Sequence, residues 1–121
     1  MFFSASNKPK RLLYFSFIHQ VNVEELQRCR RDVESMLADL PSGFRVLADL
    51  SGLDSMDIAC AKELGEVMEL FDQKGVELVV RVIPDATKDI GLSILSVFHY
   101  RNRPRTANCK TMEEAAELLS L

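Results

Sequence analysis

A strand, helix and strand between residues 44 and 83 limit the folds open to this chain more than any other feature. Residues 44–50 are strand-like, and the segment from Ile58 to Phe71 then places apolar side chains at helical spacing. Residues 76–83 are nearly continuous in valine, leucine and isoleucine, as expected for a strand buried on both faces. A helix that joins two such strands forms a βαβ unit, which predicts an α/β fold with a parallel strand pair.

The boundaries inside this unit follow from short polar signals. The Ser51-Gly52 dipeptide is expected to end the first strand, because glycine interrupts regular structure. Asp57 is the expected N-cap of the helix, and Gly75 is its expected end.

The segments that precede the unit predict a hairpin and a helix. Residues 1–4 and 11–18 resemble two strands joined by a polar turn. Asn22 and Glu25 then match a capping box, which opens a helix that should stop at residues 41–43.

The segments that follow the unit predict two helices and a short strand. A third helix is expected from Pro84 to about Tyr100, and a strand near residues 106–109. Thr111 should cap a last helix, whose expected apolar stripe is Ala115, Leu118 and Leu119. The expectation is therefore one domain over residues 1–121, with a mixed sheet of about four to five strands and about four helices.

Composition narrows the classes of function. The 121 residues carry a formal net charge of -3, which gives no overall attraction to nucleic acid, so specific nucleic-acid binding is not expected. No apolar run reaches membrane-spanning length and no signal peptide precedes the domain, which disfavours membrane insertion and secretion. Three widely spaced cysteines without a CxxC pair fit a reducing cytosol, so a cytoplasmic location is expected.

Signals for catalysis, metals or cofactors are weak. His19 and His99 lie on different elements, without the spacing of a catalytic triad or of a two-histidine metal site. Ser51-Gly52 contributes one glycine, so no glycine-rich nucleotide loop follows a strand. We therefore expect no enzyme activity, no metal and no cofactor.

The stretch VLADLSGLDSMDIACAKELGEVMELFDQKG, residues 46–75, resembles the central signature of STAS domains, and in particular of bacterial anti-sigma-factor antagonists. The order of elements agrees with that family, including a last helix entered through Thr-x-Glu-Glu-Ala. In the antagonists an Asp-Ser-Ser-Gly sequence opens the central helix, and its second serine is phosphorylated by a partner kinase. The matching residues here are Asp57, Ile58, Ala59 and Cys60, so the resemblance implies a STAS-like domain whose phosphoacceptor position holds alanine.

The resemblance also implies a surface for a protein partner, such as an anti-sigma factor or a kinase-like regulator, at the start of the central helix. Its candidate residues are Leu53, Asp54, Ser55, Met56, Asp57, Ile58 and Ala59. Within this set Ser55 could be a displaced phosphoacceptor, although a loop serine that bonds to nearby backbone explains it more simply. Either Met56 or Ile58 could instead belong to the core.

A small-ligand carrier is the alternative function. An apolar or anionic ligand could lie between residues 53–57 and residues 84–91, since open α/β sheets bind ligands at strand carboxyl ends. The candidate ligand or anion-binding residues are Asp85, Lys88, Gly91, Arg101 and Arg103, the last two from the basic segment HYRNRPR. Packing at Gly91 and solvation of the arginines are the simpler explanations. The amino-terminal strand could also pair across a homodimer.

Overall fold

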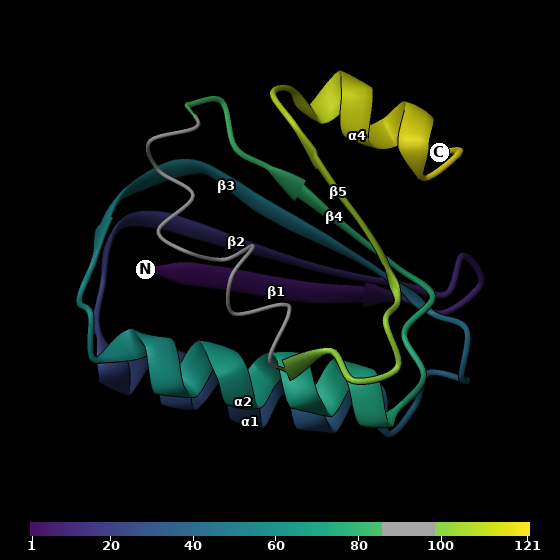
Figure 1. Ribbon diagram of the computed structural model, residues 1–121, viewed down its shortest axis with the longest axis horizontal. Coiled ribbons are helices and arrows are strands. Elements are labelled where there is room, and N and C mark those ends of the chain that lie inside the picture. Colours follow the sequence, from purple (N-terminus) through teal and green to yellow (C-terminus); the bar gives the residue numbers. More distant parts are fainter. Residues whose placement is uncertain (86–98) are drawn as a thin grey trace.

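A five-stranded sheet organises residues 1–85 and 99–121, which are the residues that the computed structural model describes (Figure 1). The strands lie in sequence order, and β1 is antiparallel to β2 whereas every other neighbouring pair is parallel. Their bounds are β1 (Phe2–Asn7), β2 (Leu12–Val21), β3 (Arg45–Met56), β4 (Leu78–Val82) and β5 (Arg105–Cys109). The described helices are α1 (Val23–Leu37), α2 (Cys60–Gln73) and α4 (Met112–Leu118). The prediction of an α/β fold with a mixed sheet is confirmed.

The third predicted helix, from Pro84 to Tyr100, falls largely on residues 86–98, which lie outside the described residues. The described part of the chain therefore has three helices rather than the four that were expected.

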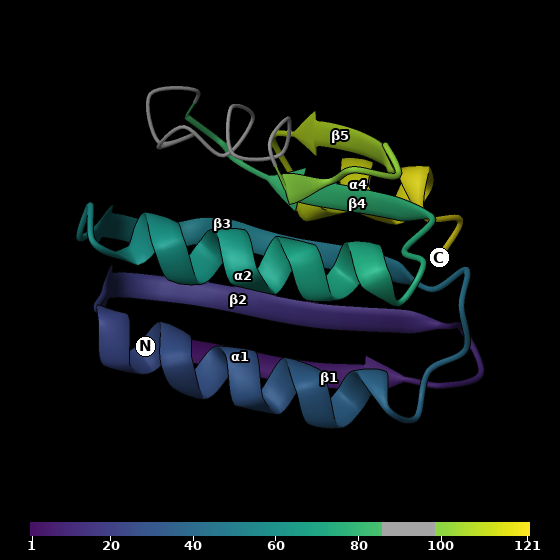
Figure 2. The same ribbon diagram turned by 60° about the horizontal axis from the view of Figure 1, so that its bottom comes forward.

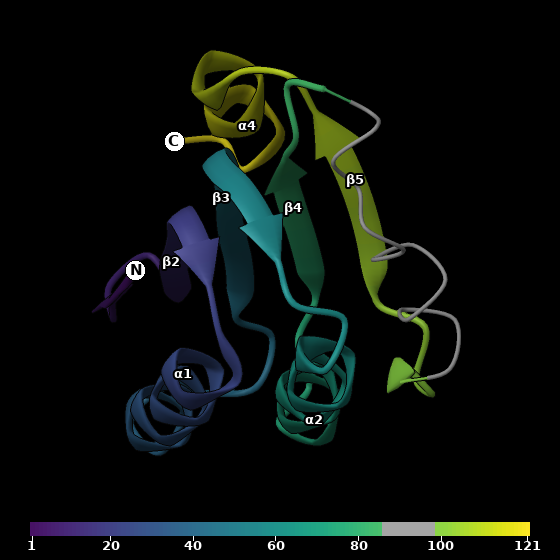
Figure 3. The same cartoon turned by 90° about the vertical axis from the view of Figure 1, so that its left-hand side faces the viewer.

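The helices lie on both faces of the sheet. Helices α1 and α2 lie side by side against one face, and α4 lies against the other (Figures 2 and 3). Alternation along β2 sends Leu13, Phe15 and Phe17 into the core under α1 and α2, while Leu12 and Tyr14 join the smaller core under α4. Strand β4 is buried along its whole length, as its apolar sequence predicts.

The two predicted helix caps whose residues are three positions apart agree with the prediction. The Asn22 side chain accepts a hydrogen bond from the Glu25 N–H at 2.9 Å, and the Glu25 side chain accepts one from the Asn22 N–H, which completes the capping box of α1. The Thr111 hydroxyl likewise accepts a hydrogen bond from the Glu114 N–H. Leu118, however, is 48% exposed, so the prediction that it is buried with Ala115 and Leu119 is wrong.

Two predicted boundaries in the βαβ unit are wrong. Strand β3 continues through Ser51-Gly52 to Met56, because β2 lies alongside it and supplies pairing partners over this length. The register shifts twice, between Ser16 and Ile18 and between His19 and Gln20. Helix α2 begins at Cys60, with Ala59 rather than Asp57 as its N-cap, so Ile58 precedes the helix. The segment expected to be a loop is thus mostly strand.

Candidate partner-binding surface

The residues expected to bind a partner, 53–59, form the end of β3 and the turn that leads into α2. They lie at the carboxyl end of the sheet beside the end of β2, where Gln20 pairs with Ser55 and Val21 with Met56. The exposed members are Asp54, Ser55, Asp57, Ile58 and Ala59. We refer to these five residues as the β3–α2 surface.

Two of the seven predicted contact residues belong wholly or partly to the core. Leu53 is 1% exposed and cannot contact a partner through its side chain, which corrects that prediction. Alternation along the strand turns Leu53 inward while Asp54 faces solvent. Met56 is half-buried against the main core, whereas Ile58 is 90% exposed, so only one of the two apolar residues points away from the core.

Asp57 shapes the turn that presents Ile58. Its carboxylate accepts a hydrogen bond from the Ala59 N–H at 3.1 Å, and its backbone carbonyl accepts one from the Cys60 N–H at 2.9 Å. Asp57 therefore satisfies backbone donors just ahead of α2 although it is not the N-cap of the helix. These bonds close a backbone turn around Ile58, whose side chain is exposed.

An open groove of about 460 Å³ lies beside this turn. Its lining residues are Gln20, Val21, Asn22, Ser55, Met56 and Asp57. The second wall of the predicted ligand site, residues 84–91, falls mostly outside the described residues. The lining residues come from the ends of β2 and β3 and from the residue that follows each strand.

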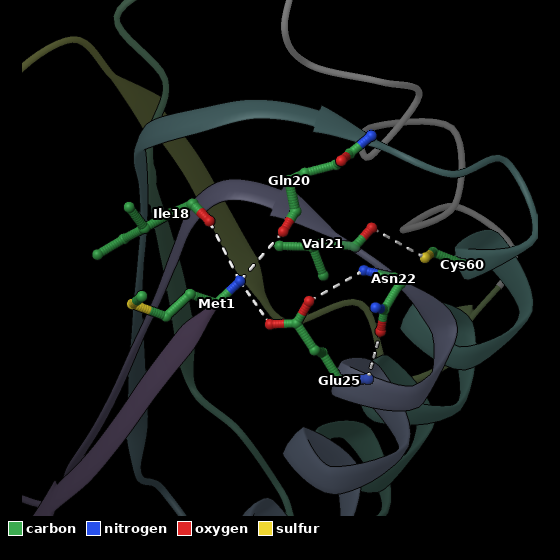
Figure 4. A network of polar contacts seen from close by, with 7 residues as sticks. All are labelled: Met1, Ile18, Gln20, Val21, Asn22, Glu25 and Cys60. Atoms are coloured by element: carbon green, nitrogen blue, oxygen red, sulfur yellow. Dashed lines mark hydrogen bonds and ion pairs between the residues drawn. The ribbon is translucent and has the colours of Figure 1, made fainter.

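A polar network fixes the β2 side of the groove (Figure 4). The amino group of Met1 donates hydrogen bonds to the carbonyls of Ile18 and Gln20 at 3.2 and 3.1 Å and pairs with Glu25 at 2.5 Å. The hydrogen bond from the Met1 ammonium is the main reason that the pKa of Glu25 lies below its usual value. From the other side, the Cys60 thiol donates to the Val21 carbonyl at 3.7 Å and ties α2 to the end of β2.

His19 lies at this surface although sequence reasoning did not select it. Its Nδ1 is 3.3 Å from Asp54 Oδ2, and both side chains are exposed. His19 has a φ of 59°, in the left-handed region, where the register between β2 and β3 shifts. The signal for this contact is the pairing of two strands 35 residues apart, which no local sequence motif contains.

Three of the five predicted ligand or anion-binding residues are among the described residues, and they lie at two different ends of the sheet. Asp85 follows β4 at the carboxyl end of the sheet, whereas Arg101 and Arg103 precede β5 at its amino end. The length of a five-residue strand separates these ends, roughly 16 Å at 3.3 Å per residue. Lys88 and Gly91 lie outside the described residues. Asp85 and the two arginines therefore lie at opposite ends of the sheet, and a ligand-binding role for any of them stays a prediction.

The loop that carries the arginines is attached to α2 by Asp72. The Asp72 carboxylate accepts hydrogen bonds from the Arg101 and Asn102 N–H groups at 3.2 and 3.1 Å and from the Asn102 side-chain amide at 3.2 Å. In residues 1–85 and 99–121 no group of three or more histidine, cysteine or acidic side chains could hold a metal ion. None of the helices in those same ranges is long and apolar enough to cross a membrane.

Comparisons with known proteins identify the fold. No family model and no curated protein sequence matches the chain. Among solved structures, an uncharacterised protein of the DUF3478 family from Shewanella loihica, described as having a SpoIIAA-like fold, superposes with a TM-score of 0.74 at 14% identity, covering 98% of this chain and 92% of that one.

Two anti-sigma factor antagonists are also similar in structure. SpoIIAA in its unphosphorylated form gives a TM-score of 0.63 at 15% identity, over 99% of this chain and 98% of that one. An anti-sigma factor antagonist from Mycobacterium paratuberculosis gives 0.62 at 14% identity, over 100% and 96%. At these identities the likeness is one of fold, and the chain has the SpoIIAA-like fold of STAS domains.

Proposed function

We propose that this chain is a non-catalytic regulatory protein-interaction module of the STAS type, which binds a protein partner through the β3–α2 surface. The observation that carries the proposal is Ile58, which is 90% exposed on a turn closed by the hydrogen bonds of Asp57. An exposed apolar side chain with polar neighbours in the sequence can act as an anchor for a partner pocket. Asp54, Ser55 and Asp57 supply the polar rim.

Ala59 removes one possible way of controlling partner binding. This residue caps α2 without a side-chain hydrogen bond, and its methyl group cannot accept a phosphoryl group. It occupies the position that matches the phosphorylated serine of the antagonists in the family resemblance. Regulation by phosphorylation at this position is therefore excluded from the proposal, whereas Ser55 on the same surface keeps a hydroxyl that a kinase could modify.

The class of partner is suggested by the structural neighbours. Two of them are named anti-sigma factor antagonists, so an anti-sigma factor or a kinase-like regulator is the first class to test. Such a partner would need an apolar pocket for Ile58 and donors for the carboxylates of Asp54 and Asp57.

Ile58→Lys tests this proposal. The substitution should abolish co-purification with the native partner, because a charge would enter an apolar pocket. The free energy of unfolding should stay within about 0.5 kcal/mol of the parent value, as is usual for exposed sites. Leu118→Lys is the matched control, since it replaces an apolar residue that is 48% exposed on α4, on the other face of the sheet. The control should retain the partner. Equal retention by both variants would contradict the proposed surface.

A further inference from the structure

Strand β1 forms an edge of the sheet, and no other described element lies beyond it (Figure 3). Met1 and Ile18 exchange two backbone hydrogen bonds, at 2.8 and 3.2 Å, so Met1 is in a hydrogen-bonded pair with β2. In an antiparallel ladder such pairs alternate, and Phe3 and Ala5 therefore also bond to β2. The N–H and C=O groups of Phe2, Ser4 and Ser6 consequently point away from β2, toward the free edge.

This edge lacks the usual protection against pairing. Its sequence, FFSASN, contains no charged residue and no proline, and Phe3 is 54% exposed. The opposite edge strand, β5, begins at Arg105 directly after Pro104, and both residue types discourage edge-to-edge pairing. The contrast between the two edges indicates that β1 is the one suited to accept another strand.

We propose that β1 pairs with β1 of a second copy of this chain, antiparallel and with Ser4 on the two-fold axis. In this register Ser4 faces Ser4, and Phe2 faces Ser6, so every outward N–H and C=O of the six-residue strand finds a partner. A shift by two residues leaves one of the three outward-facing residues without a partner on each strand. The sheets of the two copies then continue across the axis.

Side chains and charges agree with this register. Phe3 of one copy lies opposite Ala5 of the other on the face away from α1, so the exposed ring packs on a small apolar residue. Antiparallel pairing also brings Lys10 toward the partner's end at which Glu24 lies in the first turn of α1, beside the ion pair of Glu25 with the Met1 ammonium. These contacts favour a second copy over an unrelated strand. The dimer does not depend on the β3–α2 surface, which lies at the end of the sheet rather than on its edge.

Ser4→Pro tests the dimer. Proline removes the Ser4 N–H, which makes no bond to β2, so the fold should persist while the central pair of intermolecular bonds is lost. In a sedimentation concentration series we expect the parent and the control Ser4→Ala to reach twice the 13.7 kDa chain mass. Ser4→Pro should remain a monomer with an unchanged circular dichroism spectrum.

Cysteine cross-linking tests the register independently. The three natural cysteines are buried and free, so a new surface thiol can be oxidised selectively. Ser4→Cys should form a disulfide-linked dimer, because the two residues face each other on the axis. Ser6→Cys should not, because the two copies of residue 6 would lie roughly 14 Å apart along the paired strands. A parent that stays monomeric throughout the concentration series, or cross-linking at residue 6 without cross-linking at residue 4, would overturn the proposal.

Discussion

At the scale of single residues, Asp72 connects elements that are distant in sequence. It is buried on α2, and its carboxylate receives three hydrogen bonds from Arg101 and Asn102. Asp72→Ala should lower the free energy of unfolding by about 3 kcal/mol, because it leaves these donors without an acceptor. Urea denaturation measures the change. Asp39→Ala is the control, since its pair with Lys8 is exposed and should be worth under about 1 kcal/mol. Similar losses in the two variants would contradict this role.

The role of Asp72 also shows what sequence reasoning could not find at the basic segment. Arg101 and Arg103 attracted attention through their charge, whereas the structure uses the backbone N–H of Arg101 to attach the loop to α2. The donor of this hydrogen bond is a backbone N–H, which every residue except proline has, and the acceptor lies 29 residues away. Residue type therefore cannot reveal the contact. Leu53 was misplaced for a related reason, because its burial depends on the strand continuing past Gly52.

At the scale of elements, Gly65 leaves room for the side chain of His99 to pack against α2. A Cβ at position 65 would lie 2.5 Å from His99 Nε2, so a larger residue there would force the imidazole to move. His99 Nδ1 also bonds to Glu69 Oε1 at 2.7 Å, one turn further along the helix. The imidazole is thus held over one face of α2.

Gly65→Ala tests this packing through a double-mutant cycle. In the parent, the substitution should lower stability by about 1 kcal/mol, because displacement of His99 outweighs the gain in helix propensity. In a His99→Ala background the same change should raise stability by up to about 1 kcal/mol, the difference in helix propensity between glycine and alanine. Chemical denaturation of the four proteins gives the coupling. The same sign of effect in both backgrounds would rule out the packing role.

Elements were predictable where their signals are local. The capping box of α1 depends on residues 22 and 25 alone, and the buried strand β4 depends on its own apolar run, so both agree with the sequence. The end of β3 was not predictable, because Ser51-Gly52 resembles a break until β2 lies beside it and pairs with residues 52–56. Ile58 likewise matched the spacing of α2 although the helix begins two residues later.

At the scale of the whole molecule, the sheet separates two cores of unequal size. Cys29 and Cys60 belong to the larger core under α1 and α2, and Cys109 belongs to the smaller one under α4. The smaller core is bounded by β5, which among the described residues is an edge strand paired with β4, and by the seven-residue helix α4. Short elements at an edge open at lower free energy than central ones, so the two cores should differ in local stability.

Labelling of Cys29 and Cys109 can report this difference in local stability. Thiol reagents react with the thiolate, and burial raises the pKa of Cys29 to about 12, so reaction at neutral pH requires the core to open. Burial also raises the pKa of Cys109. We expect Cys109 to be labelled first, with a weak dependence on urea, because opening β5 and α4 exposes little surface. Cys29 should be labelled only on global unfolding, with the full urea dependence of the equilibrium transition. Peptide mapping after timed labelling measures both rates, and identical rates with identical urea dependence would mean that the two cores unfold as one unit.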